Sequence, residues 1–88
     1  MRYTVLVTNR ARKQLQSLPA TTRERIAEAI GMLGNNPHDS TLDIKALTND
    51  SEAQYRLRIG NYRVKYSRDD GIKIIEVVRV GHRKDVYR

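Results

Sequence analysis

Residues 55–66 alternate between apolar and basic or polar side chains on either side of Gly60 and Asn61. Alternation with a period of two is typical of a β-strand that buries one face, and a Gly-Asn pair between two such runs predicts a two-residue hairpin turn. A turn of this length fixes the register of its strands, and residues directly opposite each other share a face. The segment therefore predicts an antiparallel hairpin with one apolar face and one basic face.

The predicted register pairs like with like. The opposed apolar pairs are Ile59 with Tyr62, Leu57 with Val64 and Tyr55 with Tyr66, and the opposed basic pairs are Arg58 with Arg63 and Arg56 with Lys65. Like charges directly opposite each other destabilise a sheet, which folding alone does not explain. A polyanion laid across this face would turn the repulsion into binding, because Arg binds phosphate bidentately. The alternative is that the long side chains splay into water.

Periodicity and turn signals place the remaining elements. Residues 3–8 predict a strand, Asn9 to Pro19 a short helix, and 72–80 an apolar strand buried on both faces. A second helix is predicted from the capping-box spacing of Thr21 and Glu24 to Leu33, with residues 34–37 stopping it. Residues 38–53 form a polar connection. The expected fold is a single α+β domain over residues 1–88, ordered β-α-α-β-β-β, with a mostly antiparallel sheet and a helical hairpin on one face.

The positive charge lies in the second half of the chain. Residues 1–53 hold seven basic and six acidic side chains, residues 54–88 hold ten and four, and the whole chain carries +7. A localised positive field suits a polyanion, either nucleic acid or an acidic protein. Gly81 is expected to end the last strand and let the chain curl back, which would carry His82, Arg83 and Tyr87 toward the basic face.

The motifs that the chain lacks narrow the chemistry. There is no Cys, no His-x-Glu, no paired-acid cluster and no Gly-rich phosphate loop, so we expect no metal and no cofactor. The remaining route to RNA cleavage is attack of a 2′-hydroxyl on the neighbouring phosphate. That route needs a base, cations for the charge developing at phosphorus, and a proton donor for the leaving 5′-oxygen.

Two segments resemble the RelE/ParE toxin superfamily. They are Tyr-Arg-Leu-Arg-Ile-Gly-Asn-Tyr-Arg-Val-Lys-Tyr (55–66) and Val-Val-Arg-Val-Gly-His-Arg-Lys-Asp-Val-Tyr (77–87). Residues 11–19 resemble the first helix of that superfamily, and with Lys45-x-Leu47 the likeness spans essentially the whole chain. The resemblance implies the order of elements given above. For the RelE branch it also implies a toxin that cleaves mRNA in the ribosomal A site and is neutralised by a co-expressed antitoxin.

The resemblance also implies roles for individual residues. Arg63 and Arg83 match the phosphate-stabilising arginines, and Tyr87 matches a C-terminal Tyr proposed to orient or deprotonate the 2′-hydroxyl and to stack on a base. Arg56 and Arg58 stand where well-known members carry lysines. Since Arg is effectively always charged, these two can stabilise charge but cannot act as the general base. His82 is a second candidate for that role. The expected RNA-binding residues are Arg56, Arg58, Lys65, Lys84 and Lys45.

Two other functions share these features. A ParE-like toxin would block DNA gyrase without cutting RNA, although ParE-like members usually lack the Arg and Tyr set. A non-enzymatic nucleic-acid-binding module would bind with steep salt dependence. Under either toxin hypothesis the expected partner is an antitoxin with an acidic segment, which would also bring the pair to promoter DNA. The ribosome and mRNA are the other expected partners, and with no apolar run long enough for a membrane span we expect a cytoplasmic protein.

Overall fold

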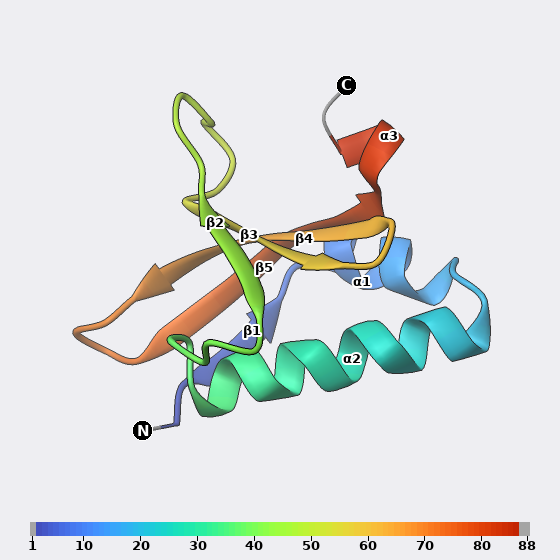
Figure 1. Ribbon diagram of the computed structural model, residues 1–88. Coiled ribbons are helices and arrows are strands. Elements are labelled where there is room, and N and C mark those ends of the chain that lie inside the picture. Colours follow the sequence, from blue (N-terminus) through green and yellow to red (C-terminus); the bar gives the residue numbers. More distant parts are fainter. Residues whose placement is uncertain (1, 87–88) are drawn as a thin grey trace.

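The computed structural model describes residues 2–86 and contains a sheet flanked by helices (Figure 1). The elements in chain order are β1 (Thr4–Val7), α1 (Asn9–Gln16), α2 (Ala20–Asn35), β2 (Asp43–Ala46), β3 (Tyr55–Ile59), β4 (Tyr62–Asp69), β5 (Ile74–His82) and α3 (Arg83–Val86). The predicted α+β class and the helical hairpin are confirmed. The predicted order lacked β2, which forms inside the segment expected to be only a connection, and α3.

The sheet has five strands in the order β1-β5-β4-β3-β2. β1 runs parallel to β5, and the other neighbours are antiparallel. The strand missed by the sequence, β2, is a short edge strand whose residue Lys45 lies opposite Arg56. Its four residues, Asp43–Ala46, do alternate in polarity, but the run is too short for its periodicity to stand out from the polar segment around it.

The β3–β4 hairpin has the predicted register at every pair, from Tyr55 opposite Tyr66 to Ile59 opposite Tyr62. Gly60 has a φ of +57°, a left-handed conformation that favours glycine and closes the turn. Leu57 and Val64 are fully buried against the helices. The alternating pattern is therefore the pattern of the core.

The two long helices lie on one side of the sheet. In Figure 1, α1 and α2 lie below the sheet, while α3 and the loop of residues 47–53 (the 47–53 loop) rise from the opposite side. We call that opposite side the outer face. It carries the basic side chains Lys45, Arg56, Arg58, Arg63, Lys65 and Arg79, as the strand registers require.

β5 differs from its prediction in burial and in length. Within β5, Glu76 is exposed between buried Ile75 and Val77, so this strand is not buried on both faces. Ile72, which was predicted to lie in the strand, is in the turn before it and is 67% exposed. β5 also continues through Gly81 to His82, where a break was expected. A β-bulge shifts the register, since Lys65 pairs with Arg79 but Tyr66 pairs with Val77. The extra residue, Val78, is what turns Arg79 to the outer face and Val80 into the core.

The ends of α2 also differ from the prediction. The residue before the helix is Pro19, with no side-chain cap, so the capping box expected at Thr21 and Glu24 is wrong. At the other end Gly34 lies inside the helix and is buried, and a Cβ there would lie 2.8 Å from the Val5 side chain. Gly34 therefore permits close packing of α2 on β1 rather than ending the helix.

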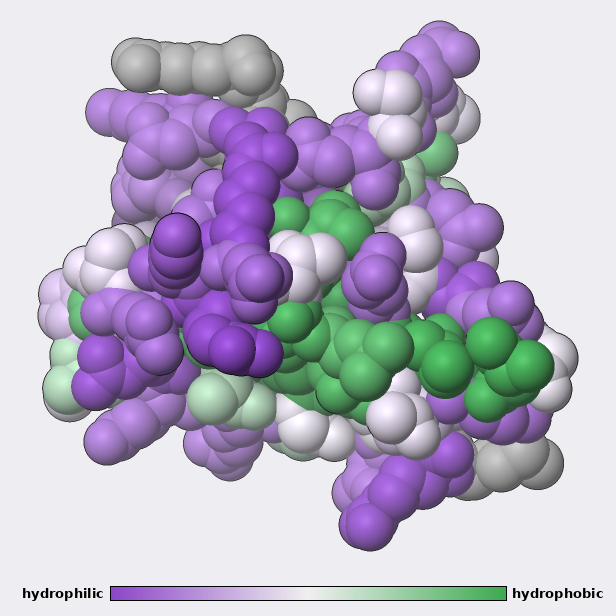
Figure 2. Space-filling view, turned by 180° about the vertical axis from the view of Figure 1, so that it is seen from behind, coloured by the Kyte–Doolittle hydropathy of each residue, from purple (hydrophilic) through white to green (hydrophobic). Residues whose placement is uncertain are grey.

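Apolar side chains remain exposed along the edge of the sheet near β1. Figure 2, seen from behind, shows a band of hydrophobic surface there, and the most exposed large apolar residues include Leu6 and Ile72. Contiguous apolar surface on a small protein is a common sign of an interaction site. Among residues 2–86 no helix has the length and hydropathy to cross a membrane.

Replacement of Tyr66 by Phe tests the core. The Tyr66 ring is fully buried, its hydroxyl has no hydrogen-bond partner among the described residues, and burial raises its pKa to about 12. Since an unsatisfied buried hydroxyl costs free energy, Tyr66→Phe should leave the free energy of unfolding at pH 7 unchanged or raise it by up to about 1 kcal/mol. Urea unfolding with Tyr62→Phe as the control measures this difference.

The same variant should change the alkaline stability. A folded-state pKa above the ordinary value of 10.0 favours the neutral phenol, so this stabilisation is complete below pH 10 and is lost as the pH rises through about 12. Tyr66→Phe should therefore lose less stability between these pH values than wild type does. An equal loss in both proteins would contradict the assignment.

Candidate functional site

The outer face has a basic floor with a segment rising on either side of it. Strands β3, β4 and β5 form the floor, and the 47–53 loop and α3 are the two flanking segments, which we call the walls (Figure 1). The floor is basic because the hairpin register turns its apolar side chains to the helices. The sequence placed the basic floor but did not predict the walls.

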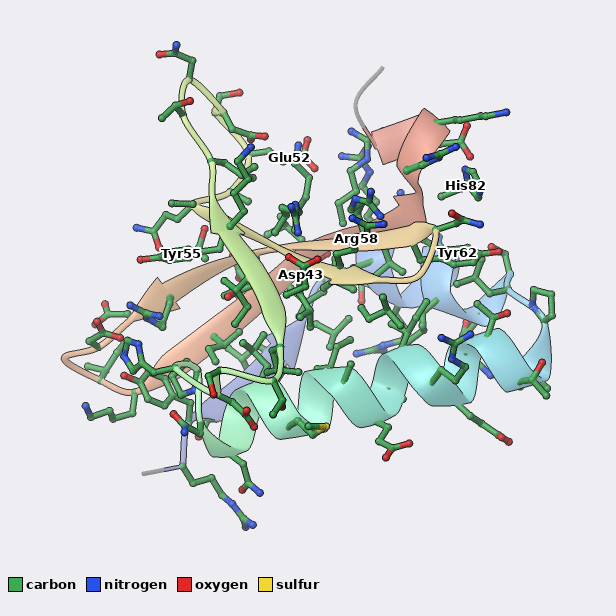
Figure 3. The ribbon with its side chains drawn as sticks, viewed as in Figure 1. Asp43, Glu52, Tyr55, Arg58, Tyr62 and His82 are labelled. Carbon is green, nitrogen blue, oxygen red and sulfur yellow. The ribbon has the colours of Figure 1, made fainter. Side chains whose placement is uncertain are left out.

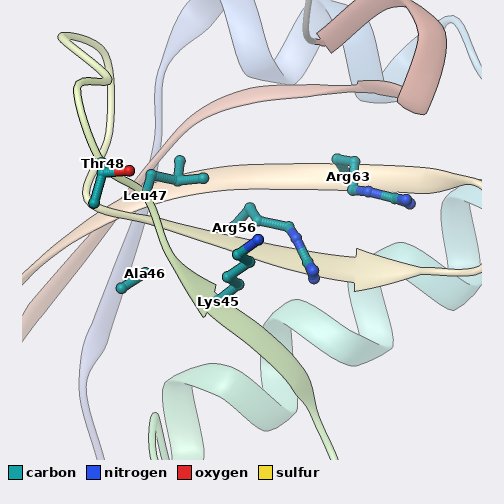
Figure 4. A pocket seen from close by; sticks show the side chains of 6 residues that line it. All are labelled: Lys45, Ala46, Leu47, Thr48, Arg56 and Arg63. Atoms are coloured by element: carbon teal, nitrogen blue, oxygen red, sulfur yellow. The ribbon is translucent and has the colours of Figure 1, made fainter.

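A pocket of about 370 Å³ opens at the β2 side of this face, lined by Lys45, Ala46, Leu47, Thr48, Arg56 and Arg63. Lys45 and Arg56 lie directly opposite each other on β2 and β3, and Arg63 lies beyond them on β4 (Figure 4). Three of the sequence-predicted site residues therefore line one cavity. Three positive charges around a cavity of this size suit a phosphate with part of its nucleotide.

The opposed arginines at the hairpin end share an acceptor in the turn. Arg63 Nη1 donates to the Gly60 carbonyl at 3.2 Å and to the Tyr62 carbonyl at 3.1 Å, and Arg58 Nε approaches the Gly60 carbonyl at 3.4 Å. Arg63 is only 9% exposed, whereas Arg58 is open to solvent. The turn thus holds the Arg63 guanidinium under cover and leaves Arg58 exposed.

Carboxylates from β2 and the 47–53 loop balance the basic floor. Asp43 Oδ1 accepts from Arg56 Nη1 at 3.1 Å and its Oδ2 lies 4.0 Å from Arg58 Nε, close together as Figure 3 shows for Asp43 and Arg58. Asp50 Oδ2 lies 2.6 Å from Lys65 Nζ. These pairs correct the expectation that folding does not explain the opposed cations, because the segment taken for a plain connection supplies their counterions.

Asp50 holds the 47–53 loop to the floor. Its Oδ1 accepts from the backbone N–H groups of Glu52 and Ala53 at 2.8 and 3.1 Å, while Lys65, only 5% exposed, binds its other oxygen. The hydrogen bond from Lys65, with help from these N–H groups, lowers the pKa of the Asp50 carboxyl. Lys65 was expected to bind RNA, and the structure places it beneath the loop instead of on the open part of the floor.

His82 lies on the other side of the sheet from the basic floor. It pairs with Tyr62, whose ring it meets edge-on at 5.6 Å (Figure 3). With Gln14 of α1 and Leu18, which follows that helix, it lines a separate hollow. Its Nδ1 accepts from the Lys84 backbone N–H at 3.2 Å. The strand does not end at Gly81, so the expected curl that would bring His82 to the basic face does not occur. His82 acts here as a cap of α3.

The other C-terminal candidates begin at α3. Arg83 and Lys84 are exposed there, and the Arg83 backbone N–H donates to the Asn61 carbonyl in the hairpin turn at 2.8 Å. The chain thus returns to the turn that carries Arg58 and Arg63. Tyr87, expected at the 2′-hydroxyl, lies outside the described residues.

Arg79 is a site residue that the sequence reasoning missed. It lies opposite Lys65 on the outer face, with 19% of its side chain exposed, and contacts Glu52 and the carbonyl of Asp85. Strict alternation from Ile75 and Val77 would have turned it inward, and a bulge leaves no clear mark in a run of apolar residues. A basic residue in such a run was the one available signal.

This arrangement can bind and stabilise negative charge. Fixed guanidinium groups around a cavity act on phosphate oxygens without having to reorganise. Within residues 2–86 no group of three or more His, Cys, Asp or Glu side chains is placed to hold a metal ion. The floor therefore offers cations to a phosphodiester.

Comparison with known protein families gives an independent result. The family model of the ParE toxin of the type II toxin–antitoxin system parDE matches residues 5–87. The chain is also 38% identical over 87 residues to the toxin RelE of Mycobacterium tuberculosis, covering 98% of this chain and 87% of that protein. Residues 1–88 are thus similar to a known toxin along nearly their whole length.

Solved structures with this fold include toxins bound to antitoxins. The RelE–RelB complex of the archaeon Pyrococcus horikoshii matches with a TM-score of 0.80 and 31% identity, over 97% of this chain and 99% of that one. The toxin–antitoxin complex RelBE2 of M. tuberculosis matches with a TM-score of 0.79 and 31% identity, over 93% and 99%.

Replacement of Asp50 by Asn tests how the loop is held. Removing one partner of a largely buried ion pair is destabilising, so Asp50→Asn should lower Tm at pH 7 by about 5 °C or more. Because the folded pKa of Asp50 is depressed, its contribution is present above the ordinary value of 3.8 and is lost as the pH falls through the lower folded value. The gap between wild type and variant should therefore close in acid.

Thermal unfolding followed by circular dichroism between pH 2 and 7 measures this gap. Glu28→Gln, on the exposed surface of α2, is the matched control and should leave Tm unchanged. A gap for Asp50→Asn that stays constant down to the lowest pH would show that the carboxylate charge plays no part.

Proposed function

The chain belongs to the ParE toxin family of type II toxin–antitoxin systems, within the RelE/ParE superfamily, and we propose that it is a RelE-type endoribonuclease that cleaves mRNA in the ribosomal A site. The observation that carries the proposal is the pocket on the outer face, which Lys45, Arg56 and Arg63 line. A toxin that acts without RNA chemistry has no need of guanidinium groups fixed around a cavity of nucleotide size. Relatives named RelE support the same branch.

The proposed reaction needs only the RNA and the protein. The 2′-hydroxyl oxygen attacks the adjacent phosphorus, the bond from phosphorus to the 5′-oxygen breaks, and the products are a 2′,3′-cyclic phosphate and a 5′-hydroxyl. One proton leaves the 2′-hydroxyl and another reaches the leaving oxygen. Arg63 and Arg83 would stabilise the charge that develops on the phosphorane oxygens. We assign the 2′-hydroxyl to Tyr87, and no step to His82.

The basic residues would divide the work. The two ion pairs that Asp43 makes with Arg56 and Arg58 are partly open to water. A phosphate can therefore replace the Asp43 carboxylate at little cost in free energy. The pair of Lys65 with Asp50 is nearly buried and costly to break. Arg56, Arg58, Lys45 and Lys84 would therefore bind the RNA, while Lys65 fastens the 47–53 loop.

We further propose a cognate antitoxin as the physiological partner. Solved relatives are toxin–antitoxin complexes. The basic outer face would attract an acidic segment, and the apolar band near Leu6 and Ile72 (Figure 2) would give it surface to bury. Binding of the complex to promoter DNA would come from the antitoxin.

A second candidate is inhibition of DNA gyrase without RNA cleavage, because the matching family model is that of ParE toxins. The two functions share the fold, so only identification of the cellular target distinguishes them. Growth arrest with intact mRNA and an induced DNA-damage response would support gyrase as the target.

Replacement of Arg83 by Ala tests the proposed nuclease. Expression of wild type should produce cuts within codons of translated messages, mapped by primer extension. Loss of one charge-stabilising group typically costs about 100-fold in rate, so Arg83→Ala should abolish visible cuts. Tyr87→Phe should do the same.

Arg12→Ala is the matched control, since Arg12 is exposed on α1 behind the sheet. It should cut like wild type. The variants Arg83→Ala and Arg12→Ala must also keep the same Tm, which separates chemistry from folding. Intact transcripts in arrested wild-type cells would overturn the proposal.

A further inference from the structure

The terminal helix α3 spans only Arg83–Val86, too short to be stable alone. The described contacts that hold it come from three places. The Arg83 N–H binds the Asn61 carbonyl at 2.8 Å, the Lys84 N–H binds His82 Nδ1 at 3.2 Å, and Arg79 Nη2 donates to the Asp85 carbonyl at 2.9 Å. The first two fix the start of α3, and the third fixes its end.

The contact from Arg79 matches what a helix end requires. The last carbonyls of a helix have no partner within it, and a cation there is favoured by the helix dipole. Arg79 also reaches the 47–53 loop, where its Nη1 lies 3.5 Å from Glu52 Oε2. One guanidinium on the floor therefore joins the 47–53 loop to the C-terminal segment. The bulge at Val78 is what turns this side chain to the outer face.

We propose that Arg79 is a positioning residue that holds α3 against the outer face and so places the segment beginning at Arg83 for the cleavage reaction. The proposal rests on the proposed function, because it assigns a purpose to the position of Arg83. Arg79 is largely covered by its own two contacts. Its effect is therefore on the geometry of the site, not on the affinity for RNA.

Order parameters of the backbone N–H groups, from ¹⁵N relaxation of the full chain, test the anchor without reference to catalysis. In Arg79→Met, residues 83–85 should fall from about 0.85 to below about 0.6, while the strands stay rigid. Arg68→Met is the matched control, since Arg68 is also a mostly buried, ion-paired arginine, on β4 near the β4–β5 turn. It should leave α3 rigid. Unchanged order parameters in Arg79→Met would overturn the proposal.

Glu52→Gln separates the two contacts of Arg79. It weakens the contact with the loop and keeps the one with Asp85, so α3 should stay as ordered as in wild type. If Arg79→Met does not fold, Arg79→Lys replaces it. An ammonium group lacks the planar fork of Arg and cannot make both contacts, so α3 should again lose order. Mobility of α3 in Glu52→Gln equal to that in the Arg79 variants would refute direct anchoring.

Cleavage of mRNA on stalled ribosomes supplies the second readout. Arg79→Met should lower kcat by at least about tenfold with KM within about twofold, because a misplaced catalytic segment slows chemistry more than binding. A rise in KM alone would make Arg79 an RNA-binding residue and overturn the positioning role. If wild type cleaves nothing, the proposed function fails, while the order parameters still decide whether Arg79 anchors α3.

Discussion

The two-residue turn at Gly60 and Asn61 sets the register on which the rest of the molecule depends. By making opposed residues share a face, it sends Leu57 and Val64 into the core and leaves the cations on the outer face. Two backbone carbonyls of the turn also accept hydrogen bonds from other parts of the chain. The Gly60 carbonyl accepts from the Arg63 side chain, and the Asn61 carbonyl accepts from the Arg83 backbone N–H. The turn that sorts the two faces therefore also brings Arg63 and the start of α3 to the end of the basic floor.

A basic floor can fold without RNA only if its charge is balanced. Asp43 supplies that balance from the surface and Asp50 from within the 47–53 loop. The difference in burial gives the two pairs different roles. A phosphate can displace the exposed Asp43 carboxylate from its arginines at little cost in free energy. The buried pair of Asp50 and Lys65 is costly to break, so it keeps the 47–53 loop in place. Substrate binding and loop anchoring can thus coexist on one face.

Much of the site could be predicted from the sequence because strand periodicity reports faces. The positions of Arg56, Arg58 and Arg63 on the outer face follow from alternation and turn length alone. The counterions could not be predicted in this way. They come from residues 38–53, where the one alternating run is only four residues long, and their partners lie across strand pairs that only the folded sheet creates. His82 was misplaced because strand pairing with Tyr62 carries β5 past Gly81.

The sequence by itself determined the hairpin register, the division between core and basic face, and the surplus of charge in the second half. The register and the division of faces are local properties, since one turn and its flanking side chains specify them. The surplus of charge follows from the composition alone. Only the tertiary structure decided the direction of Arg79, because a bulge depends on how β5 meets β4 and not on its own alternation. The parallel pairing of β1 with β5 and the anchoring of α3 likewise depend on contacts between segments far apart in the chain.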